Sequence, residues 1–304
     1  MSTKKKPAPK RAAPLFDRVT LIGLGLIGSS LARAIKQGRI ARSLVACDAD
    51  AGVRAKVTEL KLADLVEADA RKAVTGADLV VVCTPVSTYP AIAEVIGPKL
   101  KKGAILSDVG SVKQVALDAF GPHVRKGVHL VPGHPVAGTE HSGPEAGFAE
   151  LFDGRWCILT PPMGASPAAV DKIAALWQRA GMHVVTMAAM HHDRVLAITS
   201  HVPHLIAYTI VNTVSDLEAH MKAEVVKFAA SGFRDFTRVA ASDPVMWRDI
   251  FLANKEPVLE MLGRLYEDIA LLQKAIRFDD GETLQRVFAR SRQIRRSIVQ
   301  ARQD

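Results

Sequence analysis

The chain has 304 residues, of which 48% are hydrophobic and 5% aromatic. This length accommodates two domains of ordinary size, and the apolar content is sufficient to fill their cores. The formal net charge is +9, but much of the excess lies in a Lys-rich N-terminal segment and an Arg-rich C-terminal segment. Because neither segment contains interleaved aromatic residues or a nucleic-acid-binding motif, the composition argues against nucleic acid as a partner.

The N-terminal segment and the spacing of the cysteines indicate the cellular location. The segment MSTKKKPAPKRAAP lacks the apolar region of a signal peptide, and no apolar run reaches the roughly eighteen residues of a membrane span. Cys47, Cys83 and Cys157 are far apart and form no CxxC pair, which favours buried, reduced thiols. We therefore expect a cytoplasmic protein with no membrane contact, and a disordered basic tail over residues 1–14.

The first strongly patterned stretch is RVTLIGLGLIGSSLARAIKQGRI, residues 18–40. It predicts an apolar strand, a glycine-rich turn of the GxGxxG type and a helix that begins near Ser29. Such a turn lets backbone amides approach a pyrophosphate, which also meets the positive end of the helix dipole. The sequence therefore predicts a dinucleotide site, with cofactor-binding residues Gly23, Gly25, Leu26, Ile27 and Gly28.

Two later strands extend this site. The run SLVACDAD contains Asp48, twenty residues past Gly28, at the spacing where a carboxylate binds the ribose hydroxyls of NAD. The same charge would repel the 2′-phosphate of NADP, so NAD is the predicted cofactor. The run DLVVVCTPVSTYP is typical of a parallel strand buried on both faces, and the residues that follow it, Thr84 and Pro85, are expected to line the cofactor cleft.

Polar residues gather after the next two predicted strands. The strand in GAILSDVGSVK is followed by a loop with Ser111, and the strand predicted in GVHLVPGHPVAGTEHSG is followed by Thr139 and Glu140. His134 lies between Gly133 and Pro135, where a rigid backbone would hold the side chain out into open space. Two more strands, in RWCILTPP and MHVVTM, and a helix over residues 166–180 complete an α/β domain predicted over residues 15–189.

Helical periodicity dominates residues 190–304, so a second, all-helical domain is predicted there. A helix over residues 193–215 places His201 and His204 on nearly one face, but no third ligand follows at a familiar spacing, so no metal site is expected. A helix over residues 254–277 has an apolar stripe suited to a core or a dimer contact. The predicted fold class is α/β, an N-terminal Rossmann-type doubly wound sheet followed by an all-helical dimerisation and substrate domain.

Four sequence blocks resemble the prephenate/arogenate dehydrogenase family, also called cyclohexadienyl dehydrogenases, of tyrosine biosynthesis. They are LIGLGLIGSSLA, LSDVGSVK, GHPVAGTEHSGPEA with SHVPHLIA, and GFRDFTRVAASDPVMWRDI. One departure is Val202, where the family more often has Leu. The resemblance implies a homodimeric, NAD-dependent enzyme that decarboxylates prephenate to 4-hydroxyphenylpyruvate, arogenate to tyrosine, or both. Its substrate would be a dianionic or zwitterionic cyclohexadienyl acid.

The resemblance also implies roles for individual residues. His134 would accept the proton of the substrate's ring hydroxyl, which Ser111 would also contact. Arg238 would bind a substrate carboxylate, with Asp235, three residues earlier, orienting the guanidinium. The other residues assigned to the substrate are His204, Glu140, Ser200 and Thr139.

Other interpretations stay open at this point. The chain is alternatively another two-domain NAD oxidoreductase, of the β-hydroxyacid dehydrogenase or pyrroline-carboxylate reductase type, or an NAD-sensing module without catalysis. Arg238 is alternatively a surface ion-pair partner of Asp235, Glu140 a loop cap and His204 a core histidine. Between the two substrates, a Glu140 carboxylate near the ammonium of arogenate favours arogenate, or both.

Overall fold

The structure is a computed structural model that describes residues 13–216, 221, 224, 227 and 230–300. Most of the predicted basic tail, residues 1–12, lies outside the described residues. The chain forms two compact units, divided after Asn254. The helices between the last strand and Asn254 therefore belong to the same compact unit as the sheets.

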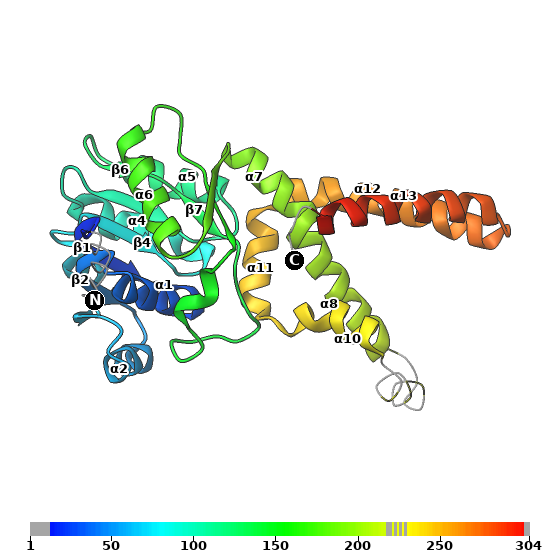
Figure 1. Ribbon diagram of the computed structural model, residues 1–304, viewed down its shortest axis with the longest axis horizontal. Helices are drawn as coiled ribbons and strands as arrows, with labels where there is room; N and C mark the ends of the chain where they lie inside the picture. Colours follow the sequence, from blue (N-terminus) through cyan, green and yellow to red (C-terminus); the bar gives the residue numbers. More distant parts are fainter. Residues whose placement is uncertain (1–12, 217–220, 222–223, 225–226, 228–229, 301–304) are drawn as a thin grey trace, which may run out of the picture. The chain divides into compact units, whose positions relative to one another are not determined.

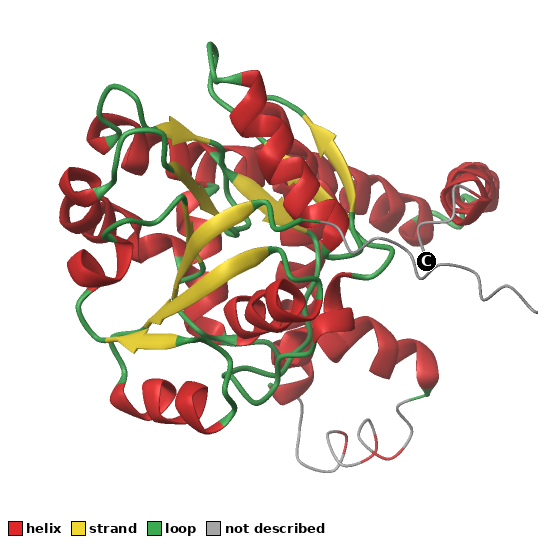
Figure 2. Ribbon diagram, turned by 60° about the vertical axis from the view of Figure 1, so that its left-hand side comes forward, coloured by secondary structure: helices red, strands yellow, loops and turns green. Residues whose placement is uncertain are grey.

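A six-stranded parallel sheet forms the centre of the first unit (Figures 1 and 2). Its strand order is β3-β2-β1-β4-β5-β6, which is the order of a dinucleotide-binding Rossmann sheet. The predicted doubly wound sheet is confirmed. Its strands are β1 Phe16–Ile22, β2 Ala41–Cys47, β3 Leu65–Glu67, β4 Leu79–Val82, β5 Ile105–Asp108 and β6 His129–Leu130.

Both faces of this sheet are covered by helices, as Figure 2 shows. Alternate residues of β4 enter different apolar clusters: Leu79 and Val81 pack with α1 and α6, whereas Val80 and Val82 pack with α4 and α5. Burial on both sides explains why this strand is continuously apolar. The helices of this region are α1 Leu26–Gln37, α2 Ala51–Glu59, α3 Ala70–Val74, α4 Tyr89–Ile96, α5 Gln114–Phe120 and α6 Pro167–Arg179.

The strand predicted around His134 is divided in two. Strand β6 ends at Leu130, and β7, Gly133–Pro135, belongs to a second sheet of order β7-β8-β9. Pro132 separates them, and it has no N–H with which to extend the first sheet. Strand β8, Trp156–Leu159, runs antiparallel to β7, and β9, His183–Thr186, runs parallel to β8. His134 therefore lies within a strand of the small sheet.

A long helix follows, in three parts: α7 Ala189–Leu196, a π-helical turn Ala197–His201, and α8 Val202–Ser215. It starts four residues before the predicted Asp193. Pro203 cannot donate to the carbonyl one turn earlier, which accounts for the wider turn that precedes it. Short 3-10 turns lie at Val86–Thr88, Gly97–Lys99, Gly121–His123, Ala149–Phe152 and Arg238–Ala241.

Two further helices of the described part of the first unit are α10 Ser231–Thr237 and α11 Pro244–Ala253. The Asp243 carboxylate accepts a hydrogen bond from the Met246 amide and so caps the N-terminus of α11. The second unit is a pair of helices, α12 Lys255–Arg277 and α13 Gly281–Gln300. Helix α12 matches the predicted apolar helix over residues 254–277.

The segment Ala189–Ser215 is long and apolar enough to cross a membrane by length and composition. Within it, however, Asp193 and His201 are buried and bonded to other parts of the first unit. These contacts attach the N-terminal part of the segment, residues 189–201, to the rest of the first unit.

Candidate active site

The glycine turn after β1 has the geometry of a phosphate cradle. Gly23 has φ +90°, and a Cβ on Gly28 would lie 2.0 Å from the Gly23 carbonyl oxygen, so neither position admits a side chain. Gly25 precedes α1 without any side-chain cap, and nothing lies within 4 Å of the place its Cβ would occupy. The first amides of α1, including those of Leu26 and Ile27, therefore have no intrahelical acceptor and suit a pyrophosphate.

Asp48 directly follows β2, beside this turn. Its Oδ2 accepts the Leu24 amide at 2.9 Å and its Oδ1 accepts the Asp50 amide at 3.0 Å. Each carboxylate oxygen retains acceptor capacity for a ribose hydroxyl. The nearby Arg54 donates to the carbonyls of Asp48 and Ala49, so its guanidinium is held against the backbone. These residues fit NAD.

Replacing Asp48 with Ser is expected to reduce the ratio of kcat/KM for NAD to that for NADP by about tenfold or more, because a charge-assisted hydrogen bond is lost. Asp50→Ser is the matched control, since the Asp50 carboxylate caps α2 through the Val53 amide. Steady-state kinetics with both cofactors measure the ratio. An unchanged ratio in the Asp48 variant would contradict the assigned role.

Thr84 lies against the glycine turn, as the cofactor prediction requires. A Cβ on Gly23 would lie 2.6 Å from the Thr84 methyl carbon, and the Thr84 and Thr88 hydroxyls are 2.7 Å apart. The exposed Pro85 follows. In the same loop, the Ser87 hydroxyl donates to the Asp249 carboxylate of α11 at 2.5 Å, which attaches the loop after β4 to this helix.

A buried ion pair organises the loop after β5. Asp108 and Lys113 have fully buried side chains and form a salt bridge. Lys113 Nζ also donates to the Gly133 carbonyl at 2.7 Å, and the Asp108 carboxylate accepts the amides of Gly133 and Gly110. Two of these contacts join the end of β5 and the loop with the half-buried Ser111 to strand β7, and the Tyr89 hydroxyl of α4 also donates to the Asp108 carboxylate.

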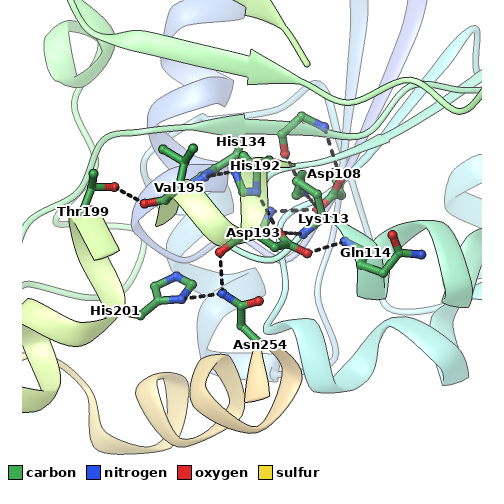
Figure 3. A network of polar contacts seen from close by, with 12 residues as sticks. Asp108, Lys113, Gln114, His134, His192, Asp193, Val195, Thr199, His201 and Asn254 are labelled. Atoms are coloured by element: carbon green, nitrogen blue, oxygen red, sulfur yellow. Dashed lines mark hydrogen bonds and ion pairs between the residues drawn. The ribbon is translucent and has the colours of Figure 1, made fainter. Parts of the chain in front are cut away.

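His134 is buried in β7 and is 7% exposed. Its Nδ1 lies 2.9 Å from Nε2 of His192, whose Nδ1 lies 2.7 Å from Oδ1 of Asp193 (Figure 3). Burial lowers the pKa of His134 well below its usual value, and the neighbouring His192, Lys113 and His201 lower it further. The imidazole is therefore neutral at physiological pH and is able to accept a proton.

The second predicted histidine, His204, lies at the start of α8. Its ring stacks on Trp247 of α11 with a centroid separation of 3.7 Å, and its Nδ1 donates to the Ser200 carbonyl at 2.8 Å. This contact leaves Nε2 as the free acceptor of a neutral ring. Burial lowers the pKa of His204, and the charge of Arg238 also lowers it. Ser200 thus contributes its backbone rather than its hydroxyl to the contact.

Arg238 pairs with a residue distant in sequence. Its Nη1 lies 3.3 Å from Oε2 of Glu140, and both side chains reach solvent. The sequence analysis expected Asp235 as the partner of this guanidinium, whereas the structure pairs it with Glu140. A hydrogen bond from its own amide lowers the pKa of Glu140, and Arg238 lowers it further. Thr139, beside Glu140, is exposed, and its hydroxyl accepts the His141 amide at 3.3 Å.

The structure adds residues to the site that the sequence analysis left without a role. His192 contacts His134 and Asp193 contacts His192, while Asn254 donates to Nδ1 of His201 and to the Asp193 carbonyl, each at 2.9 Å. Burial lowers the pKa of His201 to about 4, opposed by Asp193, while His192 and His204 lower it further. In the sequence, the adjacent residues His-His-Asp at 191–193 were the feature from which their role could have been predicted.

Among the described residues, no group of three His, Cys, Asp or Glu side chains is arranged to hold a metal ion.

The Rossmann strand order, the glycine turn, the carboxylate after β2 and a neutral buried histidine define an NAD-dependent oxidoreductase. Two family models match the chain: the nucleotide-binding domain of prephenate dehydrogenase over residues 31–186, and the dimerization domain of prephenate dehydrogenase over residues 188–290. The chain belongs to the prephenate dehydrogenase family. Since both halves match one family, the alternative of a β-hydroxyacid dehydrogenase or pyrroline-carboxylate reductase is excluded.

Individual relatives agree with this assignment. The chain is 40% identical to cyclohexadienyl dehydrogenase of Zymomonas mobilis over 284 residues, which cover 93% of this chain and 97% of the relative. It is 32% identical to prephenate dehydrogenase of Bacillus subtilis, covering 92% of this chain and 75% of the relative. Among solved structures, prephenate dehydrogenase from Aquifex aeolicus in complex with hydroxyphenyl propionate and NAD+ has a TM-score of 0.83 at 29% identity, covering 93% of this chain and 98% of that one.

Proposed function

We propose that this chain catalyses the NAD-dependent oxidative decarboxylation of prephenate, arogenate or both, yielding 4-hydroxyphenylpyruvate or tyrosine in tyrosine biosynthesis. The single observation that supports the chemistry best is the position of His134, a buried imidazole whose neighbour Gly133 is bonded to Asp108 and Lys113 at the end of β5 and in the loop after it. The names of the chain's relatives and the family assignment support the substrate class.

The reaction needs few groups from the protein. NAD, when bound, supplies the hydride acceptor. The ring carbon that loses hydride bears a hydroxyl, and His134 takes the proton of that hydroxyl as its oxygen becomes a ketone. The electrons of the bond to the carboxylate para to it then enter the ring as CO₂ leaves, and the ketone oxygen takes the proton back from His134, so that the ring becomes a phenol. His134 in this position contributes about 10²–10⁴-fold in rate as a general base, and Ser111 contacts the same hydroxyl.

Arg238 supplies the charge for an anionic substrate. Its guanidinium is 61% exposed and pairs with Glu140 at 3.3 Å, so a substrate carboxylate is able to replace or share this partner. A guanidinium binds a carboxylate with two parallel hydrogen bonds. His204 and Thr139 would form the adjacent parts of the substrate site.

We expect Arg238→Gln to raise KM for the substrate by about 10- to 100-fold, the equivalent of one charge-assisted contact, with a smaller change in kcat. Arg234→Gln on the neighbouring α10 is the matched control, since Arg234 is an exposed residue of the same segment. Initial rates over a range of substrate concentrations separate the two constants. A lowered kcat with unchanged KM would contradict the role of Arg238 in binding.

The choice between the two substrates centres on Glu140. Its carboxylate suits the ammonium group of arogenate better than the keto group of prephenate, so we propose activity on arogenate, alone or with prephenate. Rates of NADH or NADPH formation with each substrate and each cofactor test both proposals. Turnover with NAD and either substrate supports the function, and the ratio of kcat/KM values gives the preference. Bound NAD without turnover of either substrate would favour the NAD-sensing alternative.

We also propose a cytoplasmic homodimer. The segment Ala189–Ser215 is apolar but only 28% buried in its most apolar window, and Ile198 and Val211 on it are exposed. Within the second unit, Tyr266 and Ile269 of α12 are likewise exposed. The description of the matched C-terminal family model as a dimerization domain supports a second copy as the partner. Molar mass by light scattering tests the dimer, and cell fractionation tests the location.

A further inference from the structure

Three buried side chains on two elements form a line that ends at the proposed proton acceptor. His134 lies on β7, and His192 and Asp193 lie on α7; His192 is fully buried and Asp193 is 2% exposed. Nδ1 of His134 lies 2.9 Å from Nε2 of His192, and Nδ1 of His192 lies 2.7 Å from Oδ1 of Asp193 (Figure 3).

The positions of the hydrogens follow from the far end of this line. The Asp193 carboxylate accepts the backbone amides of Lys113 at 2.8 Å and Gln114 at 2.9 Å, and an ionised carboxylate only accepts. Nδ1 of His192 must therefore carry the hydrogen that it shares with Asp193. In a neutral His192 the other nitrogen, Nε2, is then a bare acceptor, so Nδ1 of His134 must donate to it. Nε2 of His134 remains without a hydrogen.

We infer that His192 and Asp193 are positioning residues that fix the tautomer of His134, so that its Nε2 is the atom that accepts the substrate proton. The inference rests on the proposed function for the identity of that proton. The pair acts through His134, since it stabilises the imidazolium that forms when Nε2 is protonated. A carboxylate–histidine pair in serine proteases orients and stabilises a catalytic imidazole in the same way.

The surroundings support a neutral pair of imidazoles. The charged groups that face His134 are Lys113 from the loop after β5 and, beyond it, Asp108 of β5, while His201 faces it from the π-helical turn. Burial lowers the pKa of His192, although Asp193 opposes this effect. The charge of Lys113 is balanced by Asp108, and the Asp193 end of the line is held by the amides of Lys113 and Gln114 at the start of α5.

The tautomer is observable in the unmodified full-length protein. Nitrogen NMR of the histidine-labelled enzyme, with His134→Asn to assign the signal, distinguishes an imidazole protonated at Nδ1 from one protonated at Nε2. We expect His134 to be neutral and protonated at Nδ1 at neutral pH. A His134 protonated at Nε2, or at both nitrogens, would overturn the inference without any variant of His192.

Kinetics of two His192 variants test the effect on catalysis. His192→Leu removes the acceptor and is expected to lower kcat by about 100-fold, with the NAD dissociation constant changed less than about twofold. His192→Gln retains a carbonyl acceptor and is expected to stay within about tenfold of the unmodified enzyme. Because loss of the acceptor destabilises the His134 imidazolium, the acid side of the kcat/KM profile should move to lower pH in His192→Leu.

Equal losses of kcat in His192→Leu and His192→Gln, with no movement of the pH profile, would assign His192 a packing role only and overturn the inference. Unchanged turnover in His192→Leu would do the same. The proposed function fails separately, if the unmodified enzyme oxidises neither prephenate nor arogenate; the NMR measurement still reports on the contact between His134 and His192 in that case.

Discussion

His134→Asn is expected to lower kcat by about 10²–10⁴-fold, because the side-chain amide cannot take the proton of the ring hydroxyl. Binding of NAD should change by less than about twofold, since the glycine turn follows β1 and His134 lies on β7 of the other sheet. Steady-state kinetics and a titration of NAD against protein fluorescence measure the two effects.

His129→Asn is the matched control for this substitution. His129 is a half-buried histidine in β6, five residues earlier in the chain, and it pairs with Ile105 in the main sheet. Its replacement should leave kcat within about twofold. Near-normal turnover of the His134 variant, or an equal loss in both variants, would remove His134 from the role of proton acceptor.

Lys113→Met is expected to lower the free energy of unfolding by about 3–5 kcal/mol, because it leaves the Asp108 carboxylate buried without its cation. Both side chains are completely inaccessible to solvent, and the Asp108 carboxylate is also bonded to β7 through the Gly133 amide. The substitution should therefore also lower kcat, since the loop with Ser111 and the strand with His134 lose a shared attachment. Denaturant unfolding measures the stability.

Lys101→Met provides the comparison for an exposed ion pair. Lys101 contacts Asp78 at 2.5 Å, with side chains 42% and 28% exposed, and such pairs contribute about 0–1 kcal/mol. If Lys113→Met and Lys101→Met lower the free energy of unfolding by equal and small amounts, the buried pair does not stabilise the site in the way we describe.

The dinucleotide half of the site could be predicted from the sequence because its determinants are local. The turn between Gly23 and Gly28 and the position of Asp48 after an apolar run depend on spacing along the chain, and the structure places them beside one another. The continuous apolar character of β4 likewise follows from burial on both faces.

The substrate half could be predicted less completely because its contacts join distant segments. The family resemblance implied Asp235 as the residue that orients Arg238, whereas the structure pairs Arg238 with Glu140, 98 residues away. The strand division at Pro132 depends on the existence of a second sheet, which no local pattern indicates. Of the adjacent histidines His191 and His192, only His192 is buried, and this follows from the exact orientation of α7.

The measurement that tests the account most directly is the stoichiometry of the reaction with prephenate or arogenate and excess NAD. We predict equimolar NADH, CO₂ and aromatic product, 4-hydroxyphenylpyruvate from prephenate or tyrosine from arogenate. NADH formation without release of CO₂, or no turnover of either substrate by a protein that binds NAD, would contradict the assignment of oxidative decarboxylation to this site.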